Sequence, residues 1–190
     1  MDLGRIQKEL KEIMKDSASG VSVEVMGANL QKLRGSVPGP KDTPYEGGLF
    51  IVDIDLDNQY PFVPPKMRFL TKVWHPNVSS QNGAICLDIL KDQWSPALTI
   101  KTALLSLQAL LSSPQPDDPQ DAVVAKEYLT NHPKFIETAK SWTDTYASQS
   151  KQNENLRQIL EMGFSEAAAK AALLTSGGDA QAALESLLGS

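Results

Sequence analysis

Hydrophobic residues near the start of the chain recur at the spacing of an α-helix. Ile6, Leu10, Ile13 and Met14 fall on one side of a helix that turns about 100° per residue. Asp2 can cap its amino end, because a carboxylate accepts hydrogen bonds from the free N–H groups of a first turn. We therefore expect a helix that ends in residues 17–20.

Four later segments alternate apolar and polar residues, which is typical of half-buried strands. They are residues 21–25, 30–37, 50–56 and 66–70. Turn-rich stretches separate the first three strands, and the Tyr60-to-Pro65 segment is stiff and extended because each proline fixes its own φ. The short connections favour an antiparallel meander of four strands.

Residues 71–96 show little period, and a long irregular segment inside a compact domain is usually functional. Helical spacing returns after Thr99, a credible cap, with an apolar stripe from Ile100 to Leu111. Leu105 points about 155° away from the middle of that stripe. Further helices are expected at 121–130 and from Pro133, since proline suits a first helical position.

The composition changes after Ala147. Residues 148–153 contain no apolar side chain and are interpreted as a linker. Three short helical patterns follow in residues 154–190, with Gly163 as a stop and Ser165 and Asp179 as caps. We expect an α+β catalytic domain over residues 1–147 and a minimal three-helix bundle over 154–190.

Charge and hydropathy restrict the class of protein. The 190 residues are 41% hydrophobic, and 18 basic against 23 acidic side chains give a net charge of −5. The sequence has no strongly basic patch for nucleic acid, no apolar run that could span a bilayer, and no signal-peptide core or myristoylation pattern. We therefore expect a soluble protein of the cytoplasm, and also of the nucleus, that binds neither nucleic acid nor membrane.

Cysteine usage points to one candidate nucleophile. Cys86 is the single cysteine, so no disulfide can form within the chain. One cysteine with His75 and His132 cannot complete a standard zinc site, and no metal or organic cofactor is implied. A free cysteine can also be simply a small buried hydrophobic residue, so its neighbours in the sequence must decide.

Those neighbours carry a family resemblance. The sequence His75-Pro76-Asn77, followed nine residues after the asparagine by Cys86, resembles the active-site signature of ubiquitin-conjugating enzymes. Four further motifs of that family stand in the same order around it. They are Pro44-Tyr45-Glu46-Gly47-Gly48, Tyr60-Pro61-Phe62 with Pro64-Pro65-Lys66, Trp94-Ser95-Pro96-Ala97, and Pro116-Asp117-Asp118-Pro119. The resemblance covers residues 1–147.

The resemblance implies that Cys86 accepts ubiquitin as a thioester from an activating enzyme and passes it to a lysine amine. Asn77 would donate a hydrogen bond to the oxyanion, or brace the active-site loop. Asp118 would orient the amine and accept its proton, with Asp117 sharing that role, although both could simply cap a helix and keep the loop soluble. His75 is interpreted as structural.

A Cys–His–Asn hydrolase is a competing interpretation, since the three residue types lie between His75 and Cys86. Papain-like enzymes take these groups from distant segments and have a recognisable sequence around the cysteine, which is absent here. A hydrolase also admits water, whereas a carrier must exclude it until an amine arrives.

The resemblance also implies surfaces for protein partners. Arg5 and Lys8 on the basic first helix, together with Phe62, Pro96 and Ala97 on two loops, would meet the activating enzyme and RING-type ligases. The outward Leu105 would hold the donor ubiquitin over the thioester.

The last 37 residues resemble a ubiquitin-associated (UBA) domain. Its marks are Met162-Gly163-Phe164, Gly177-Gly178-Asp179 and Leu187-Leu188. The resemblance implies that the first and last of these bind ubiquitin, although each could equally pack within the bundle. The combination resembles the enzymes that build degradation-type ubiquitin chains. The alternatives are a carrier of another ubiquitin-like modifier and a non-enzymatic ubiquitin-binding adaptor.

Overall fold

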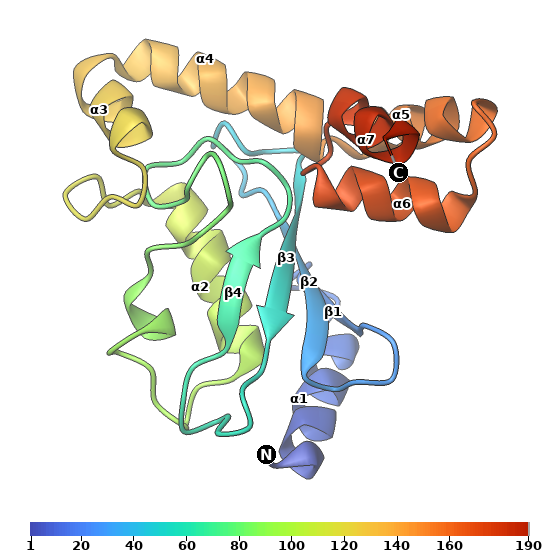
Figure 1. The fold of residues 1–190 in the computed structure, drawn as a ribbon. Coiled ribbons are helices and arrows are strands. Elements are labelled where there is room, and N and C mark those ends of the chain that lie inside the picture. Colours follow the sequence, from blue (N-terminus) through green and yellow to red (C-terminus); the bar gives the residue numbers. More distant parts are fainter. Residues whose placement is uncertain (190) are drawn as a thin grey trace.

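The computed structural model describes residues 1–189 and shows one antiparallel sheet surrounded by helices (Figure 1). Helix α1 (Leu3–Lys15) precedes the strands β1 (Ser22–Val25), β2 (Lys32–Pro38), β3 (Leu49–Asp55) and β4 (Lys66–Phe69). The strands are adjacent in chain order, and each runs antiparallel to its neighbour. The expected helix and four-stranded meander are therefore confirmed.

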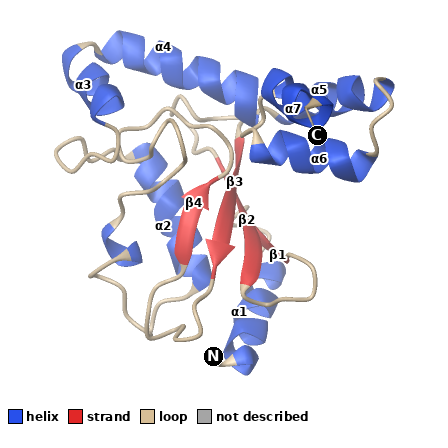
Figure 2. Ribbon diagram, viewed as in Figure 1, coloured by secondary structure: helices blue, strands red, loops and turns tan. Residues whose placement is uncertain are grey.

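Helices make up most of the second half of the chain (Figure 2). They are the 3₁₀ turn η1 (Asp88–Leu90), α2 (Ile100–Ser112), α3 (Ala122–Thr130), α4 (His132–Trp142), the π-helical turn η2 (Thr143–Ala147), α5 (Gln149–Glu161), α6 (Glu166–Thr175) and α7 (Ala180–Leu188). Asp2, Thr99, Ser165 and Asp179 each accept a backbone hydrogen bond at the start of a helix, as the sequence predicts. No helix within residues 1–189 is both long and apolar enough to cross a bilayer.

The main core lies between the sheet and α2. Alternate residues of β2 and β3 are buried, and Leu33, Phe50 and Val52 are completely inaccessible. Gly35 allows α2 to approach closely, because a Cβ at this position would lie 2.9 Å from a methyl carbon of Leu104. One face of the sheet is thus used by the helix, and the other face is left for a second layer.

His75 belongs to this core rather than to the surface. Its side chain is 0% exposed, Nε2 donates to the Leu110 carbonyl at 2.8 Å, and Nδ1 accepts from the Asn77 amide at 3.0 Å. Burial lowers the pKa of His75 from 6.5 to about 4, although the Leu110 carbonyl opposes that shift. The imidazole is therefore neutral at physiological pH, with both ring nitrogens used by the backbone.

Most of the expected linker is helical in the structure. Residues 149–153 form the start of α5. The turn η2 follows α4 directly, and only Ser148 lies between η2 and α5. The polar composition of these residues does not prevent a helix. Ser148 caps the amino end of α5, and the exposed face of α5 tolerates polar side chains. Gln152, inside the expected linker, donates to the carbonyls of Tyr146 and Gly178 at 2.8 and 3.1 Å.

Helices α5–α7 pack as a small bundle beside the sheet and the end of α4 (Figure 1). Lys72, which follows β4, holds the bundle in place. Its backbone N–H donates to the Gly177 carbonyl at 3.2 Å, its ammonium lies 3.6 Å from Asp179, and the same ammonium sits over the Tyr146 ring at 5.0 Å. The bundle is therefore docked through the turn between α6 and α7.

Acidification should weaken the fold through His75. Its folded pKa lies below its unfolded pKa, so the unfolded chain binds the extra proton first as pH falls. The contribution is fully present above pH 6.5 and is lost between pH 6.5 and about 4, by about 3 kcal/mol at most. Urea unfolding at pH 7 and pH 4 measures this loss, and His75→Gln should lose less over the same interval. Equal losses in the two proteins would exclude His75 as the source.

The docking contact can be tested at Gly177. This residue has φ +67°, and a Cβ there would lie 2.7 Å from Lys72 Cγ and 2.9 Å from the Leu70 carbonyl oxygen. Gly177→Ala should therefore loosen the bundle and speed hydrogen exchange of the Lys72 amide. Gly163→Ala is the matched control, because Gly163 also has positive φ but open space around its Cβ position. The docking role would be refuted by equal Lys72 exchange in both variants.

Candidate active site

Cys86 lies in the irregular segment that the sequence marks as functional, just before η1. Its backbone N–H donates to the Asn77 carbonyl at 2.9 Å, and an isolated bridge pairs Val78 with Ile85. These bonds hold residues 77–78 against residues 85–86 within the segment. The cysteine is 9% exposed, so its thiol is sheltered but not sealed within the core.

Two charged side chains contact the sulfur. Cys86 Sγ lies 3.3 Å from Asp118 Oδ2 and 3.2 Å from Lys91 Nζ. The hydrogen bond and charge of Cys86, and more weakly the charge of Asp118, raise the pKa of Lys91. A cysteine held between a carboxylate and an ammonium is a site for nucleophilic chemistry.

Asn77 fastens the loop that carries Asp118. Its side chain is 1% exposed, and Nδ2 donates to the carbonyls of Gln115 and Asp118, both at 2.9 Å. Its Oδ1 accepts from the Gln115 amide at 2.8 Å. Both Nδ2 hydrogens are thus used within the loop, so in this structure the amide braces the site, and donating to an oxyanion requires one of these bonds to break.

A second set of bonds fixes the far end of the same loop. The amides of Gln120 and Asp121 donate to the Pro76 carbonyl at 2.9 and 3.1 Å. The Asp121 carboxylate accepts from the Ser80 hydroxyl at 2.6 Å. The loop is therefore held to the cysteine-bearing segment at both of its ends, while Asp117 and Asp118 remain exposed between them.

The geometry excludes a cysteine–histidine pair. Both His75 nitrogens bond to backbone groups, whereas within the described part of the chain the Cys86 sulfur bonds to Asp118 and Lys91. His75 cannot act as a base toward Cys86 in this arrangement, and the Cys–His–Asn hydrolase interpretation fails. Residues 1–189 also contain no group of three or more potential His, Cys, Asp or Glu ligands for a metal ion.

The two predicted ligase loops lie together. Trp94 Nε1 donates to the Pro61 carbonyl at 2.8 Å, which links the loop of Phe62 to the loop of Pro96 and Ala97. Phe62 is 80% exposed, and the other two residues are exposed as well. A large aromatic side chain left in solvent beside small apolar residues fits a transient protein contact.

Arg5 and Lys8 differ in their surroundings. Lys8 is exposed, whereas Arg5 donates to the Glu9 carboxylate at 2.8 Å and the Leu98 carbonyl at 2.7 Å. The buried Glu9 also accepts from the Tyr60 hydroxyl at 2.8 Å. Arg5 therefore ties α1 to the segment before α2, a role that its place on a basic helix face does not reveal.

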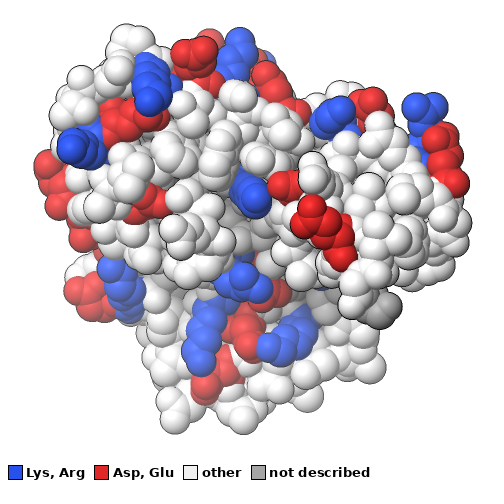
Figure 3. Space-filling model, turned by 45° about the horizontal axis from the view of Figure 1, so that its top comes forward, with Lys and Arg blue, Asp and Glu red and all other residues white. Residues whose placement is uncertain are grey.

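The remaining predicted contact residues are partly or largely accessible. Leu105 is 36% exposed on α2, Met162 is 53% exposed and Leu188 is 67% exposed, while Gly163 is exposed and Phe164 and Leu187 are partly buried. On the face drawn in Figure 3, basic and acidic side chains are interspersed without a broad patch of one sign.

Lys91 is the member of the site that sequence reasoning missed. It follows Cys86 by five residues, and nothing in that spacing alone brings an ammonium back to a thiol. The turn η1 does so, because Asp88–Leu90 folds the chain between them. Residues 71–96 show no helical spacing of hydrophobic residues, so the sequence gives no clear signal for this turn.

Comparison with known proteins agrees with this geometry. A family model described as "Ubiquitin-conjugating enzyme" matches residues 5–143, and one described as "UBA/TS-N domain" matches residues 151–187. The chain is 56% identical over 188 residues to Ubiquitin-conjugating enzyme E2 27 of Arabidopsis thaliana, covering 98% of each protein. It is 48% identical over 191 residues to human Ubiquitin-conjugating enzyme E2 K, covering 97% of this chain and 96% of that protein.

Solved structures give the same result. The E2 domain of a Toxoplasma gondii ubiquitin conjugating enzyme superposes with a TM-score of 0.75 at 56% identity, covering 78% of this chain and 100% of that one. With the matched models, relatives and fold in agreement, the chain belongs to the ubiquitin-conjugating enzymes, a family of transferases, and carries a carboxy-terminal UBA domain.

Proposed function

We propose that Cys86 is the residue that carries ubiquitin as a thioester and delivers it to a lysine amine. Membership of the family implies ubiquitin, an activating enzyme and ligases as partners. The observation that carries the assignment is the position of the cysteine sulfur, 3.3 Å from the Asp118 carboxylate and 3.2 Å from the Lys91 ammonium. No other residue of the chain offers a thiol.

The charging step follows from thiol chemistry. The Cys86 thiolate attacks the thioester carbonyl that joins the terminal glycine of ubiquitin to the activating enzyme, and the thiolate of that enzyme leaves. One thioester replaces another, so the step costs little free energy. The Lys91 ammonium lies where it can accompany the sulfur while it carries negative charge.

The discharge step needs a neutral amine. A lysine has an ordinary pKa near 10.4 and is mostly charged at neutral pH. Asp118 is exposed beside the sulfur, so its carboxylate can orient the incoming ammonium and take its proton as the amine attacks. The Cys86 thiolate then leaves, and an isopeptide bond to the acceptor lysine results. Asp117 contributes the adjacent negative charge on the same loop.

Asn77 supports this reaction through the loop. Because its amide holds the carbonyls of Gln115 and Asp118, it fixes the distance from Asp118 to Cys86. If the Asp118 bond opens as ubiquitin docks, the freed N–H can donate to the oxyanion of the tetrahedral intermediate, an interaction typically worth about 10²–10³ in rate. His75 keeps Asn77 in place through the backbone amide.

The surface residues divide among the partners. Phe62, Pro96 and Ala97 form the platform for RING-type ligases, and Arg5 and Lys8 on α1 extend toward the activating enzyme, with Lys8 as the free cation. Leu105 on α2 contacts the donor ubiquitin in the closed thioester. Each of these positions except Arg5 is accessible in the structure, which supports the assignment.

The UBA domain adds a second site for ubiquitin. Met162, Gly163 and Phe164, together with Leu187 and Leu188, form its binding surface, and the docking turn lies elsewhere on the bundle. Docking fixes this surface relative to Cys86, so even weak binding raises the local concentration of acceptor ubiquitin. This arrangement favours polyubiquitin chains of the degradation type, made in the cytoplasm and nucleus.

Charging of Cys86 tests the first proposal. Incubation with activating enzyme, ATP and ubiquitin should give an adduct that thiol reductant removes, because a thioester exchanges with added thiol. Cys86→Ser should trap an ester that resists reductant, and Cys86→Ala should give no adduct, as judged by gel mobility.

The same assay separates the alternatives. A non-enzymatic adaptor would form no adduct in the wild-type protein, and a carrier of another modifier would charge preferentially with that modifier in parallel reactions. The UBA domain favours ubiquitin over other modifiers.

The role of Asp118 is tested by discharge rather than charging. In single-turnover reactions with free lysine, Asp118→Ala should slow aminolysis at pH 7 by about 10²-fold, while leaving the rate of charging within a few-fold. The defect should shrink toward pH 9, because the neutral fraction of lysine rises roughly 100-fold between pH 7 and pH 9 and the reaction then depends less on a proton acceptor.

Asp117→Ala is the matched control, since it removes an exposed carboxylate from the same loop. We expect it to slow discharge much less than Asp118→Ala does. Equal effects of the two substitutions, or a pH-independent Asp118 defect, would contradict the proton-acceptor role.

A further inference from the structure

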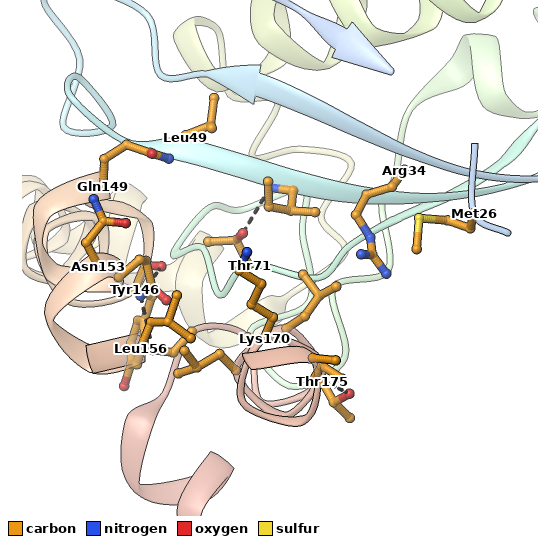
Figure 4. A pocket seen from close by; sticks show the side chains of 18 residues that line it. Met26, Arg34, Leu49, Thr71, Tyr146, Gln149, Asn153, Leu156, Lys170 and Thr175 are labelled. Carbon is orange, nitrogen blue, oxygen red and sulfur yellow. Dashed lines mark hydrogen bonds between the residues drawn. The ribbon is translucent and has the colours of Figure 1, made fainter. Parts of the chain in front are cut away.

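A large cleft separates the outer face of the sheet from the UBA domain. It has a volume of about 660 Å³ and lies between β2 and β3 on one side and α5 and α6 on the other (Figure 4). Sites for small organic ligands have volumes of about 300–1,000 Å³ and often lie between domains. The cleft is of that kind, and neither Cys86 nor the proposed ubiquitin-binding loop at 162–164 lines it.

The cleft has largely apolar walls, and its charged lining residues are all basic. Apolar walls come from both units, with Leu49 and Ile51 on the sheet facing Leu156, Leu173 and Leu174 on the bundle. The charged lining residues are Arg34 and Lys170, and no Asp or Glu lines the cleft. This contrasts with the whole chain, whose net charge is −5. The lining therefore favours a ligand that is largely apolar and carries negative charge.

Arg34 marks where that charge would sit. Figure 4 shows its side chain extending from the sheet toward α6, beside Met26. Its Nε is buried and, within residues 1–189, is the only buried side-chain nitrogen or oxygen without a hydrogen-bond partner. Protein atoms cover Nε, so a ligand would meet the outer nitrogens of this partly exposed guanidinium, which lines the cleft and has no ion-pair partner in the described residues.

The neighbouring carboxylates do not supply the acceptor. Glu24 and Asp53 stand opposite Arg34 on the two adjacent strands. No ion pair joins Arg34 to either of them in the described residues, and Asp53 lies 3.8 Å from Arg68 instead. Lys170, the second cation of the lining, is paired with Glu166 of the same helix at 2.5 Å. Arg34 is thus the cation free to bind a ligand anion.

We propose that this cleft binds an apolar carboxylic acid, with its hydrocarbon body between the sheet and α6 and its carboxylate on Arg34. A guanidinium and a carboxylate match in geometry and form strong charge-assisted hydrogen bonds. The ligand would contact both units at once, so its binding stabilises the docked position of the UBA domain. The site is separate from the thioester chemistry and does not depend on it.

Binding is tested with the full chain and dodecanoate below its micelle concentration. Isothermal titration should show one saturable site, and methyl resonances of Ile51 and Leu174 should shift together. Arg34→Gln should weaken binding at least ten-fold, because it removes the charge but retains a polar side chain. Ala171→Trp should also abolish binding, since this exposed lining residue of α6 would fill the cleft without changing its charge.

Two controls separate the site from general hydrophobic binding. Arg68→Gln, which removes an arginine of the sheet outside the cleft, should bind dodecanoate like the wild type. Dodecanol should bind wild type and Arg34→Gln alike, since it lacks the anion. Normal circular dichroism and normal Cys86 charging of each variant establish that it is folded.

The proposal would be overturned by the absence of saturable dodecanoate binding to the wild type. It would also be overturned by equal affinity of the wild type and Arg34→Gln, or by undiminished binding to Ala171→Trp.

Discussion

The side-chain amide of Asn77 joins two loops that no strand pairing connects. One loop carries Cys86 and the other carries Asp118, and three hydrogen bonds of Asn77 hold them together. Because the side chain is 1% exposed, losing either partner would leave buried polar groups unpaired, which is strongly unfavourable. This amide holds the Asp118 loop beside the Cys86 sulfur, and the proposed transfer reaction depends on that arrangement.

Two buried polar residues near the site, His75 and Asn77, form a chain of hydrogen bonds from α2 to the Asp118 loop. His75, neutral because it is buried, bonds to the Leu110 carbonyl of α2 and to the Asn77 amide. Asn77 in turn positions the Asp118 loop. Helix α2 is therefore connected to the surroundings of Cys86 through His75 and Asn77, whose side chains do not contact the sulfur. Asp117 and Asp118 are positioned by these bonds while they remain exposed.

The two units of the chain are joined by backbone as much as by side chains. The Lys72 amide bonds to the Gly177 carbonyl, and α5 begins directly after η2. This docking gives the UBA domain a fixed place beside the sheet and creates the cleft that Arg34 faces. A weak ubiquitin-binding surface gains from such placement, because its effect then depends on local concentration rather than on affinity.

The sequence by itself determined the elements and most of the candidate site. The spacing of hydrophobic residues and the capping residues predicted the strands, α2 and the helices of the small bundle. In these elements the local conformational preference of the sequence agrees with the burial in the fold. The motif around Cys86 identified the family and named Asn77 and Asp118. The helix over residues 149–153 has a local cause, the Ser148 cap, which the polar composition of the segment hides. Tertiary structure alone decided that Lys91 reaches the sulfur and that Arg5 bonds to the Leu98 carbonyl. These contacts cross a turn without a period or join residues distant in the sequence, and a pattern of hydrophobic positions carries no information about such contacts.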